Sequence, residues 1–511
     1  MIMTSYTPVL AVSCGLFAAI LILFLGNKIN PNTRESITII TSIIMTTLVF
    51  IMVPEVLNGN VYEATLWQIV DGIELKFKTD AAGMIFACIA SFLWILTSIY
   101  SIGYVRGHHE KNQTGYFAAF ATCIASAIGI AFSANLITFF IFYEMLTLAT
   151  YPLVSHYRDE KAKFSGRKYL GYTLITGQLF FVSIVWVYAH YGTCDFVPGG
   201  FIEPSSSGKT LMCILFLMMV VGGAVKAGVM PLHGWLPSAM VAPTPVSALL
   251  HAVAVVKAGA FCVLRIVCYI FGPEAACWCN GATILMWFAL ATILLSSFVA
   301  IRQDNLKARL AFSTVGQLSY IVLGITLLSV NSISGAMFHI VAHAFLKITL
   351  FMSAGAIFVT TGLSQISTMG GLVKKMPITS VCFTAASLGI AGLPLMAGFI
   401  SKFNIIQGAF AVGQPFGVIF LLAAALLALN YLIPVAQVFF GKEKITQNYD
   451  NQHHETHKGI DAAPAMLIPL VITVLIGTIL GFDPNLGPHL YDMAIMAAES
   501  ITGGEGIYLA K

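Results

Sequence analysis

The stretch HIVAHAFLKITLF, residues 339–351, places His339, His343 and Lys347 four residues apart in a run that is otherwise apolar. Residues at i, i+4 and i+8 share one face of a helix, so the three groups form a stripe about 12 Å long. A histidine titrates near neutral pH and can take a proton on one ring nitrogen and release one from the other. A lone histidine would more often be a satisfied core residue, whereas three protonatable groups in register predict a proton relay inside an apolar helix.

The composition places this helix in a membrane. Of 511 residues 58% are hydrophobic and only 9% are charged, against about 25% charged in soluble domains. The first apolar run, 8–26, has no basic residue before it and no cleavage pattern after it, so we expect it to remain as a membrane helix. The net charge of +4 has no clustered basic tail behind it, which argues against nucleic acid as a partner. The ten cysteines are scattered, and we expect them to serve as apolar side chains.

Runs of about 20 apolar residues, enough to cross the hydrocarbon core, recur along the whole chain. The sequence predicts an all-α integral membrane protein with fourteen spans: 8–27, 37–56, 80–104, 115–133, 135–156, 168–190, 210–231, 243–271, 281–301, 308–330, 332–361, 378–410, 415–440 and 464–482. The segment 59–78 alternates apolar and polar residues and is expected to form a surface hairpin or helix. No large soluble domain fits between the spans.

The basic residues outside the spans are unevenly distributed. Nearly all of them fall on connections that follow odd-numbered spans, and the opposite side holds only Lys76, Lys78, Lys209 and Lys511. Lysine and arginine accumulate on the cytoplasmic side of membrane proteins. The distribution therefore predicts that both chain termini face outward.

Five cations lie inside the predicted spans, and only one acid, Glu144, lies deep within one; the cations are Lys226, Lys257, Arg265, Lys347 and Lys402. A lysine at a helix centre costs about 2.5 to 3.5 kcal/mol on insertion scales. Arg265 is near the end of its span and is expected to reach the interface as a structural residue. Glu144 can neutralise at most one lysine, so the others must be neutral, solvated by internal water or paired with another chain. The alternative is a static pair of Glu144 with Lys226 and lysines hidden in protein contacts.

Two spans are expected to be broken, each beside a lysine. Pro231 follows Lys226 by five residues, and Pro394 precedes Lys402 by eight. Proline and glycine free backbone groups that are tolerated only where protein or water meets them. Paired interruptions of this kind indicate a transporter built from inverted repeats.

One loop could bind a metal, but we favour another interpretation. His453, His454, Glu455 and His457 lie in the most polar loop of the chain. A solvated loop explains this composition better than a metal site, so no metal is predicted.

The motifs resemble the antiporter-like, proton-translocating subunits shared by respiratory complex I and the Mrp-type multisubunit cation/proton antiporters. The resemblance rests on four motifs in family order: FYEMLTLATYPLV (142–154), KAGVMPLHGWLPSAMVAPTPVSALLHAVAVVKAG (226–259), HIVAHAFLKITLF (339–351) and GLPLMAGFISK (392–402). It looks closest to the D-type antiporter subunit. The resemblance implies a fourteen-helix core with two inverted five-helix repeats and broken seventh and twelfth helices. The implied units are 1–114 (three helices and the surface hairpin), 115–271 (first repeat), 272–441 (second repeat) and 442–511 (polar loop, last helix and tail).

By position, the resemblance implies a proton pathway of eight residues: Glu144, Lys226, His251, Lys257, His339, His343, Lys347 and Lys402. The expected function is proton movement through two half-channels of a subunit in a multisubunit complex of a bacterial-type inner membrane, with other membrane subunits and lipid as partners. No flavin, quinone or metal motif occurs, so we expect no cofactor, and any redox step belongs to partners. Sodium stays open as the ion. The alternatives are a scaffold or coupling subunit that does not pump, and the membrane subunit of an inorganic-carbon uptake complex.

Overall fold

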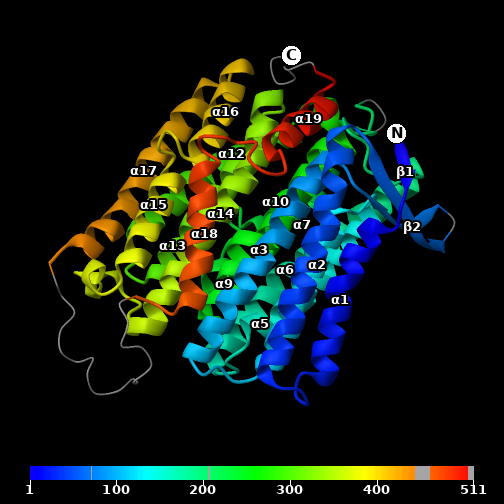
Figure 1. The fold of residues 1–511 in the computed structure, drawn as a ribbon. Coiled ribbons are helices and arrows are strands. Elements are labelled where there is room, and N and C mark those ends of the chain that lie inside the picture. Colours follow the sequence, from blue (N-terminus) through cyan, green and yellow to red (C-terminus); the bar gives the residue numbers. More distant parts are fainter. Residues whose placement is uncertain (71, 205–207, 443–460, 505–511) are drawn as a thin grey trace.

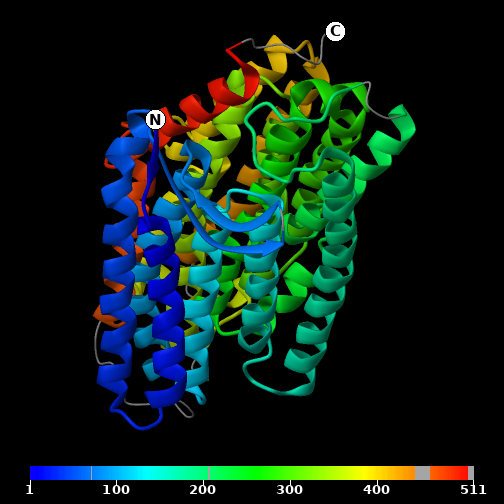
Figure 2. The same ribbon diagram turned by 90° about the vertical axis from the view of Figure 1, so that its right-hand side faces the viewer.

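The chain forms a bundle of long helices with a small sheet at one end (Figures 1 and 2). The computed structural model describes residues 1–70, 72–204, 208–442 and 461–504. Within these ranges, twelve helical segments are long and apolar enough to cross a membrane. They are α1 (Thr7–Leu25), α2 (Pro31–Leu57), α3 (Ala81–Gly107), α4 (Gln113–Ala131), α5 (Leu136–Val154), α6 (Glu160–Tyr191), α7 (Lys209–Ala227), the composite segment Thr244–Trp278, α12 (Gly281–Ile301), α13 (Leu306–Thr326), α14 (Val330–Thr361) and α17 (Pro415–Phe440).

The remaining predicted spans contain shorter helices. Segment 378–410 holds α15 (Pro377–Ala391) and α16 (Ala397–Ala411), and segment 464–482 holds α18 (Pro464–Ile479). The last helix of the described chain, α19 (Leu490–Thr502), lies across one end of the bundle (Figure 1). The count of fourteen spans and the inverted repeats therefore stay predictions. Large apolar side chains such as Phe24, Ile175 and Phe410 are exposed on the outer helices, as expected for a surface that faces lipid.

Local sequence explains where several helices begin. Asp80, Asn135, Asp159 and Asn305 each accept a hydrogen bond from a backbone N–H three residues ahead. A short polar side chain at this position satisfies an amide that has no partner within the helix. These caps lie at loop boundaries, so they fix the lengths of the apolar segments that follow.

The prediction of an all-α fold is wrong at one place. Strands β1 (Ile2–Thr4), β2 (Val61–Val70) and β3 (Ile73–Lys78) form a sheet in the order β1-β2-β3. β1 runs parallel to β2, and β2 and β3 form an antiparallel hairpin. The alternating segment 59–78 is thus a hairpin, because its alternation presents one side of each strand to the bundle. The sheet and α19 lie at the same end of the bundle (Figures 1 and 2).

The centre of the bundle is formed by two helical segments that are wholly buried. One is α14, and the other is Thr244–Trp278, which contains α9 (Thr244–Ala248), the π-helix η2 (Leu249–Val253), α10 (Val255–Arg265), the π-helix η3 (Ile266–Phe271) and α11 (Gly272–Trp278). The predicted stripe on α14 is therefore enclosed by other helices instead of facing lipid.

The helices are interrupted at both predicted points. α7 ends at Ala227, and the chain passes through Pro231 before the short helices α8 (Trp235–Ser238) and η1 (Ala239–Val241). α15 ends at Ala391, and α16 begins at Ala397 after a turn that contains Pro394. The left-handed backbone at Gly392, with φ of 94°, ends α15 at a conformation that glycine adopts without steric strain.

Candidate functional site

Lys226 lies at the end of α7 and is held by α5. Its Nζ donates a hydrogen bond to the main-chain carbonyl of Tyr143 at 2.6 Å and sits 3.3 Å from the centre of the Tyr143 ring. The Tyr143 hydroxyl in turn donates to the carbonyl of Gly222 on α7. A carbonyl oxygen and an aromatic face both attract an ammonium group without carrying a full negative charge. The lysine is therefore stabilised by neutral partners.

Glu144 is next to Tyr143 on α5 but does not hold Lys226. Neither carboxylate oxygen of Glu144 has a hydrogen-bond partner, although both atoms are buried. A Cβ atom at Gly177 on α6 would lie 2.6 Å from Oε1 of Glu144, so the glycine provides the space for this carboxylate. The static pair of Glu144 with Lys226 is not formed in the described structure.

Lys257 and His343 meet at the centre of the bundle. Nζ of Lys257 on α10 lies 2.7 Å from Nδ1 of His343 on α14, and both side chains are fully buried. The Nε2 atom of His343 has no partner. An ammonium can only donate, so a charged Lys257 requires a neutral His343 with its proton on Nε2. The pair can share a proton, because each member has a lone pair in its neutral form.

His339 is linked to the broken twelfth segment. Its Nδ1 lies 2.7 Å from Oγ of Ser401 on α16, and this hydroxyl donates to the carbonyl of Gly398. The hydroxyl has one proton, so Nδ1 of His339 is the donor to Ser401 and Nε2 is left free to accept a proton. The rings of His339 and His343 are 6.1 Å apart between centres.

Lys402 completes this end of the chain of groups. Its Nζ donates to the carbonyls of Ile390 at 2.6 Å and Ala391 at 3.3 Å, and it lies 4.9 Å from the centre of the Tyr320 ring. The last carbonyls of a helix lack partners within the helix and carry the negative end of its dipole. The break after α15 therefore creates the site that holds the ammonium of Lys402.

Lys347 and His251 occupy the other end of the stripe. Lys347 donates to Oγ of Ser313 on α13 at 2.7 Å. His251, on the π-helix η2, stacks on Phe351 of α14 with ring centres 4.7 Å apart, and neither of its nitrogens has a partner. A π-helix turn changes the direction of the side chains that follow, and such turns are frequent at functional sites.

The structure thus brings Lys257, His343, His339 and Lys402 into one connected group by way of Ser401. Lys347 and His251 flank this group on α14 and η2. Glu144 and Lys226 form a second group between α5 and α7, and no hydrogen bond of the described residues joins the two groups. The two groups are separated by elements of the buried core, in which the polar atoms of Ser247 and Gln317 also lack partners.

The sequence analysis missed the neutral side chains that hold the lysines. Ser313, Gln317 and Tyr320 lie at i, i+4 and i+7 on α13, and Ser401 directly precedes Lys402. The signal was therefore present as a second polar stripe in an apolar span. It was weak, because serine and tyrosine are common in buried helices.

Arg265 does not reach the interface as predicted. Its side chain is 1% exposed and binds both carboxylate oxygens of Asp80, the N-terminal cap of α3, with one contact of 2.8 Å. The rings of Phe196, Phe261 and Tyr269 surround the guanidinium at 4.4 to 4.9 Å. The prediction of a structural role agrees with this geometry, but the reason is a buried ion pair instead of solvent access.

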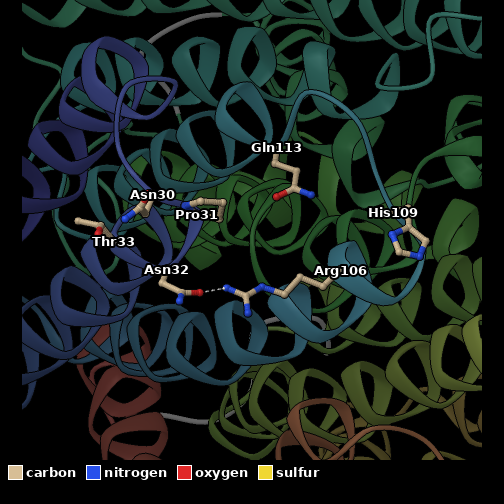
Figure 3. Close-up of a pocket in the computed structure, with 7 residues that line it drawn as sticks. All are labelled: Asn30, Pro31, Asn32, Thr33, Arg106, His109 and Gln113. Carbon is tan, nitrogen blue, oxygen red and sulfur yellow. Dashed lines mark hydrogen bonds between the residues drawn. The ribbon is translucent and has the colours of Figure 1, made fainter. Parts of the chain in front are cut away.

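Two further features lie apart from the predicted pathway. A surface pocket of about 590 Å³ opens at the α1–α2 and α3–α4 connections (Figure 3) and is lined by polar residues: Asn30, Pro31, Asn32, Thr33, Arg106, His109 and Gln113. The polar loop residues His453, His454, Glu455 and His457 lie outside the described residues. Within the described ranges, no group of three His, Cys, Asp or Glu side chains is arranged to hold a metal ion.

Comparison with known proteins gives a consistent result. Residues 133–428 match the family model described as NADH:quinone oxidoreductase/Mrp antiporter, transmembrane. The chain is 29% identical to NADH-quinone oxidoreductase subunit N of Desulforudis audaxviator (strain MP104C), over 85% of this chain and 86% of the relative. It is 32% identical to the large Na(+)/H(+) antiporter protein of Alkalihalophilus pseudofirmus (strain ATCC BAA-2126 / JCM 17055 / OF4), over 84% of this chain but only 55% of the relative. The chain therefore spans about half the length of that antiporter protein.

Solved structures show the same fold at lower identity. The membrane-bound sulfane sulfur reductase, an archaeal respiratory membrane complex, contains a chain with a TM-score of 0.83 and 22% identity, with 98% of both chains covered. The Mrp complex from Dietzia sp. DQ12-45-1b contains one with a TM-score of 0.82 and 21% identity, with 97% of this chain and 98% of the other covered.

Apolar helices around a buried set of titratable side chains define a multi-pass membrane protein of the ion-transporting class. The chain belongs to the NADH:quinone oxidoreductase/Mrp antiporter transmembrane family, as the match over more than half of its length shows.

Proposed function

We propose that this chain is a proton-translocating, antiporter-like subunit of a multisubunit membrane complex. One observation carries the proposal: among the described residues, none of the four buried lysines is held by a carboxylate. Each is held by a neutral group instead: a carbonyl for Lys226, a histidine for Lys257, a hydroxyl for Lys347 and carbonyls for Lys402. Without a fixed counter-charge, a buried lysine can lose its proton at little electrostatic cost.

The geometry supports a route with two parts. In the first part, a proton reaches His251 and the group around Lys226, where the unpaired charge of Glu144 steers it. In the second part, it passes from Lys257 and His343 to His339 and leaves by way of Lys402. Histidine nitrogens without partners stand at each step of this second part, so each ring has a free position that can accept or release a proton.

The setting of the chain is part of the same proposal. The relatives are components of quinone oxidoreductases and of Na(+)/H(+) antiporters, so we propose other membrane subunits as partners and a bacterial-type inner membrane as the location, with any redox step in a partner. Protons are favoured over sodium, because Na⁺ prefers several oxygen ligands and the pathway offers mainly nitrogen donors. Glu144 is the only carboxylate in it.

The test is proton flux in the assembled complex, reconstituted in vesicles. We expect Lys402→Ala and Glu144→Gln each to lower flux by at least about a hundredfold, the lower range of acid–base contributions. Lys163→Ala is the matched control, since this lysine is half exposed and pairs only with the exposed Glu160. Full flux in both pathway variants would instead indicate a scaffold or coupling subunit.

A further inference from the structure

A buried carboxylate lies in the α3–α4 connection, outside the predicted pathway. Glu110 is 8% exposed. Its Oε1 lies 3.0 Å from Nδ1 of His108 and accepts a hydrogen bond of 2.6 Å from the Tyr157 hydroxyl, and its Oε2 lies 3.5 Å from Nε2 of His156. Burial alone would raise the pKa of Glu110, but the hydrogen bonds from His108, His156 and Tyr157 outweigh it and lower the pKa to about 2. The carboxylate is therefore ionised at any working pH.

This cluster has access to water from one side. Gln113, which lines the surface pocket, donates to the main-chain carbonyl of Glu110 at 3.1 Å, and His109 follows the cluster's His108 directly (Figure 3). The pocket thus adjoins the connection that holds the carboxylate. A polar pocket with a fixed anion beside it concentrates cations, including protons, at its surface.

A line of hydroxyl groups leads inward from the cluster. The Tyr157 hydroxyl, which donates to Glu110, also interacts with the hydroxyl of Tyr104 on α3. The Tyr104 hydroxyl accepts a hydrogen bond from Oγ1 of Thr244 at 3.4 Å. Thr244 is the first residue of α9, which belongs to the same buried segment as His251.

The last part of the line follows one helix face. Thr244 and His251 are seven residues, or about 10 Å, apart along the helix. Ser247 lies between them, and its Oγ and both nitrogens of His251 are buried without a protein partner. Buried polar atoms of this kind are ordinarily satisfied by ordered water. Water on this face would connect Thr244 to His251.

We propose that Glu110, His108 and His156 form a proton-collecting site that supplies His251 through Tyr157, Tyr104 and Thr244. A histidine takes a proton from water, and the carboxylate stabilises the charged ring. Each hydroxyl along the line then accepts one proton on its oxygen and releases its own, so the line is unchanged after one relay. The inference rests on the proposed function. The titratable groups that face Glu110 are, by contact or charge, His108, His156, Tyr157, Tyr104, Tyr116 and Lys307.

The competing interpretation is a structural role, in which the cluster only ties the α3–α4 connection to the α5–α6 connection. The two interpretations differ in their pH dependence. A collecting site matters most when protons are scarce, whereas a lost tie between loops impairs assembly at every pH. The decisive variant therefore removes one hydroxyl from the line and leaves the cluster itself intact.

The experiment measures flux of the complete complex in vesicles from mildly acidic to mildly alkaline pH, with Tyr104→Phe and Glu110→Gln. We expect flux to fall about tenfold at the alkaline end, the lower range by which charged clefts raise ion capture, and to stay near wild type at the acidic end. Tyr100→Phe is the matched control: Tyr100 is buried one turn earlier on α3, and its hydroxyl ends on the main-chain carbonyl of Met352 at 2.7 Å. It should follow the wild type.

Tyr104→Phe keeps the ring, so it separates the line from the fold if Glu110→Gln fails to assemble. Wild-type flux of Tyr104→Phe at every pH, or an equal loss at every pH in fully assembled complex, would overturn the inference. Lys402→Ala and Glu144→Gln are measured in parallel. If these two lose flux and Tyr104→Phe does not, the collecting site fails while the proposed function stands.

Discussion

At the scale of single residues, the buried cations fall into two kinds. Arginine does not lose its proton in proteins, so a buried guanidinium needs a counter-charge, and Arg265 has one in Asp80. Lysine can become neutral when buried, and Lys347 and Lys402 are held only by hydroxyl or carbonyl oxygens. The sequence shows both kinds simply as cations within spans. The partner separates a structural cation from one suited to proton transfer.

The Asp80–Arg265 pair gives a stability prediction. Asp80→Asn leaves the guanidinium buried without its counter-charge, which should lower the free energy of unfolding by about 3 to 5 kcal/mol. Asp483→Asn removes an exposed carboxylate and serves as the control. The double variant Asp80→Leu/Arg265→Met should recover most of the loss, because apolar groups can replace a buried pair. Thermal unfolding in detergent measures all three, and unchanged stability of Asp80→Asn would contradict the structural role.

At the scale of elements, the helix breaks explain where the lysines lie. The end of α15 offers the carbonyls of Ile390 and Ala391 to Lys402, and a continuous helix would use these carbonyls in its own hydrogen bonds. Lys226 is also next to a helix end, although its carbonyl partner comes from α5. The proline and glycine residues at the breaks thus create polar sites within an apolar layer. Sequence reasoning placed the breaks but not the atoms that they expose.

Gly392 allows this arrangement to be tested. Gly392→Ala places a Cβ 3.2 Å from Cδ of Lys402 at a backbone φ of 94°, so it should displace the lysine from the carbonyls. Gly413→Ala is matched in strain, with φ of 68°, but its Cβ would meet open space. Both variants should lose about 1 to 2 kcal/mol of stability. Only Gly392→Ala should also lower proton flux, and equal flux in the two variants would show that the position of Lys402 is not critical.

At the scale of the whole molecule, the sequence predicted what depends on apolar length and missed what depends on packing. The apolar runs and both breaks were visible because they are local. The contact of Lys257 with His343 joins residues 86 apart, and that of Arg265 with Asp80 joins residues 185 apart. Helices can pack in several ways on the same apolar faces, so no local pattern fixes such contacts. The stripe on α14 was correct as a face, but its members bind three different helices.

The arrangement of the ends of the bundle also carries a prediction about orientation. The sheet and α19 lie together at one end, whereas most basic residues of the connections follow odd-numbered spans. The positive-inside rule places the basic end in the cytoplasm. Leu66 of β2 and Leu486, which precedes α19, are exposed, and Lys163 near the start of α6 is half exposed on the basic side.

Cysteine labelling in intact cells decides the orientation. Leu66→Cys and Leu486→Cys should react with a membrane-impermeant maleimide from outside, and Lys163→Cys should react only after the membrane is opened. The wild type supplies the background, since its cysteines in the described ranges are buried or partly buried. Two positions at one end guard against a partner protein that covers one of them. The reverse pattern would place the basic end outside, and Glu110 would then collect protons from the opposite compartment, so the direction of the proposed route depends on this result.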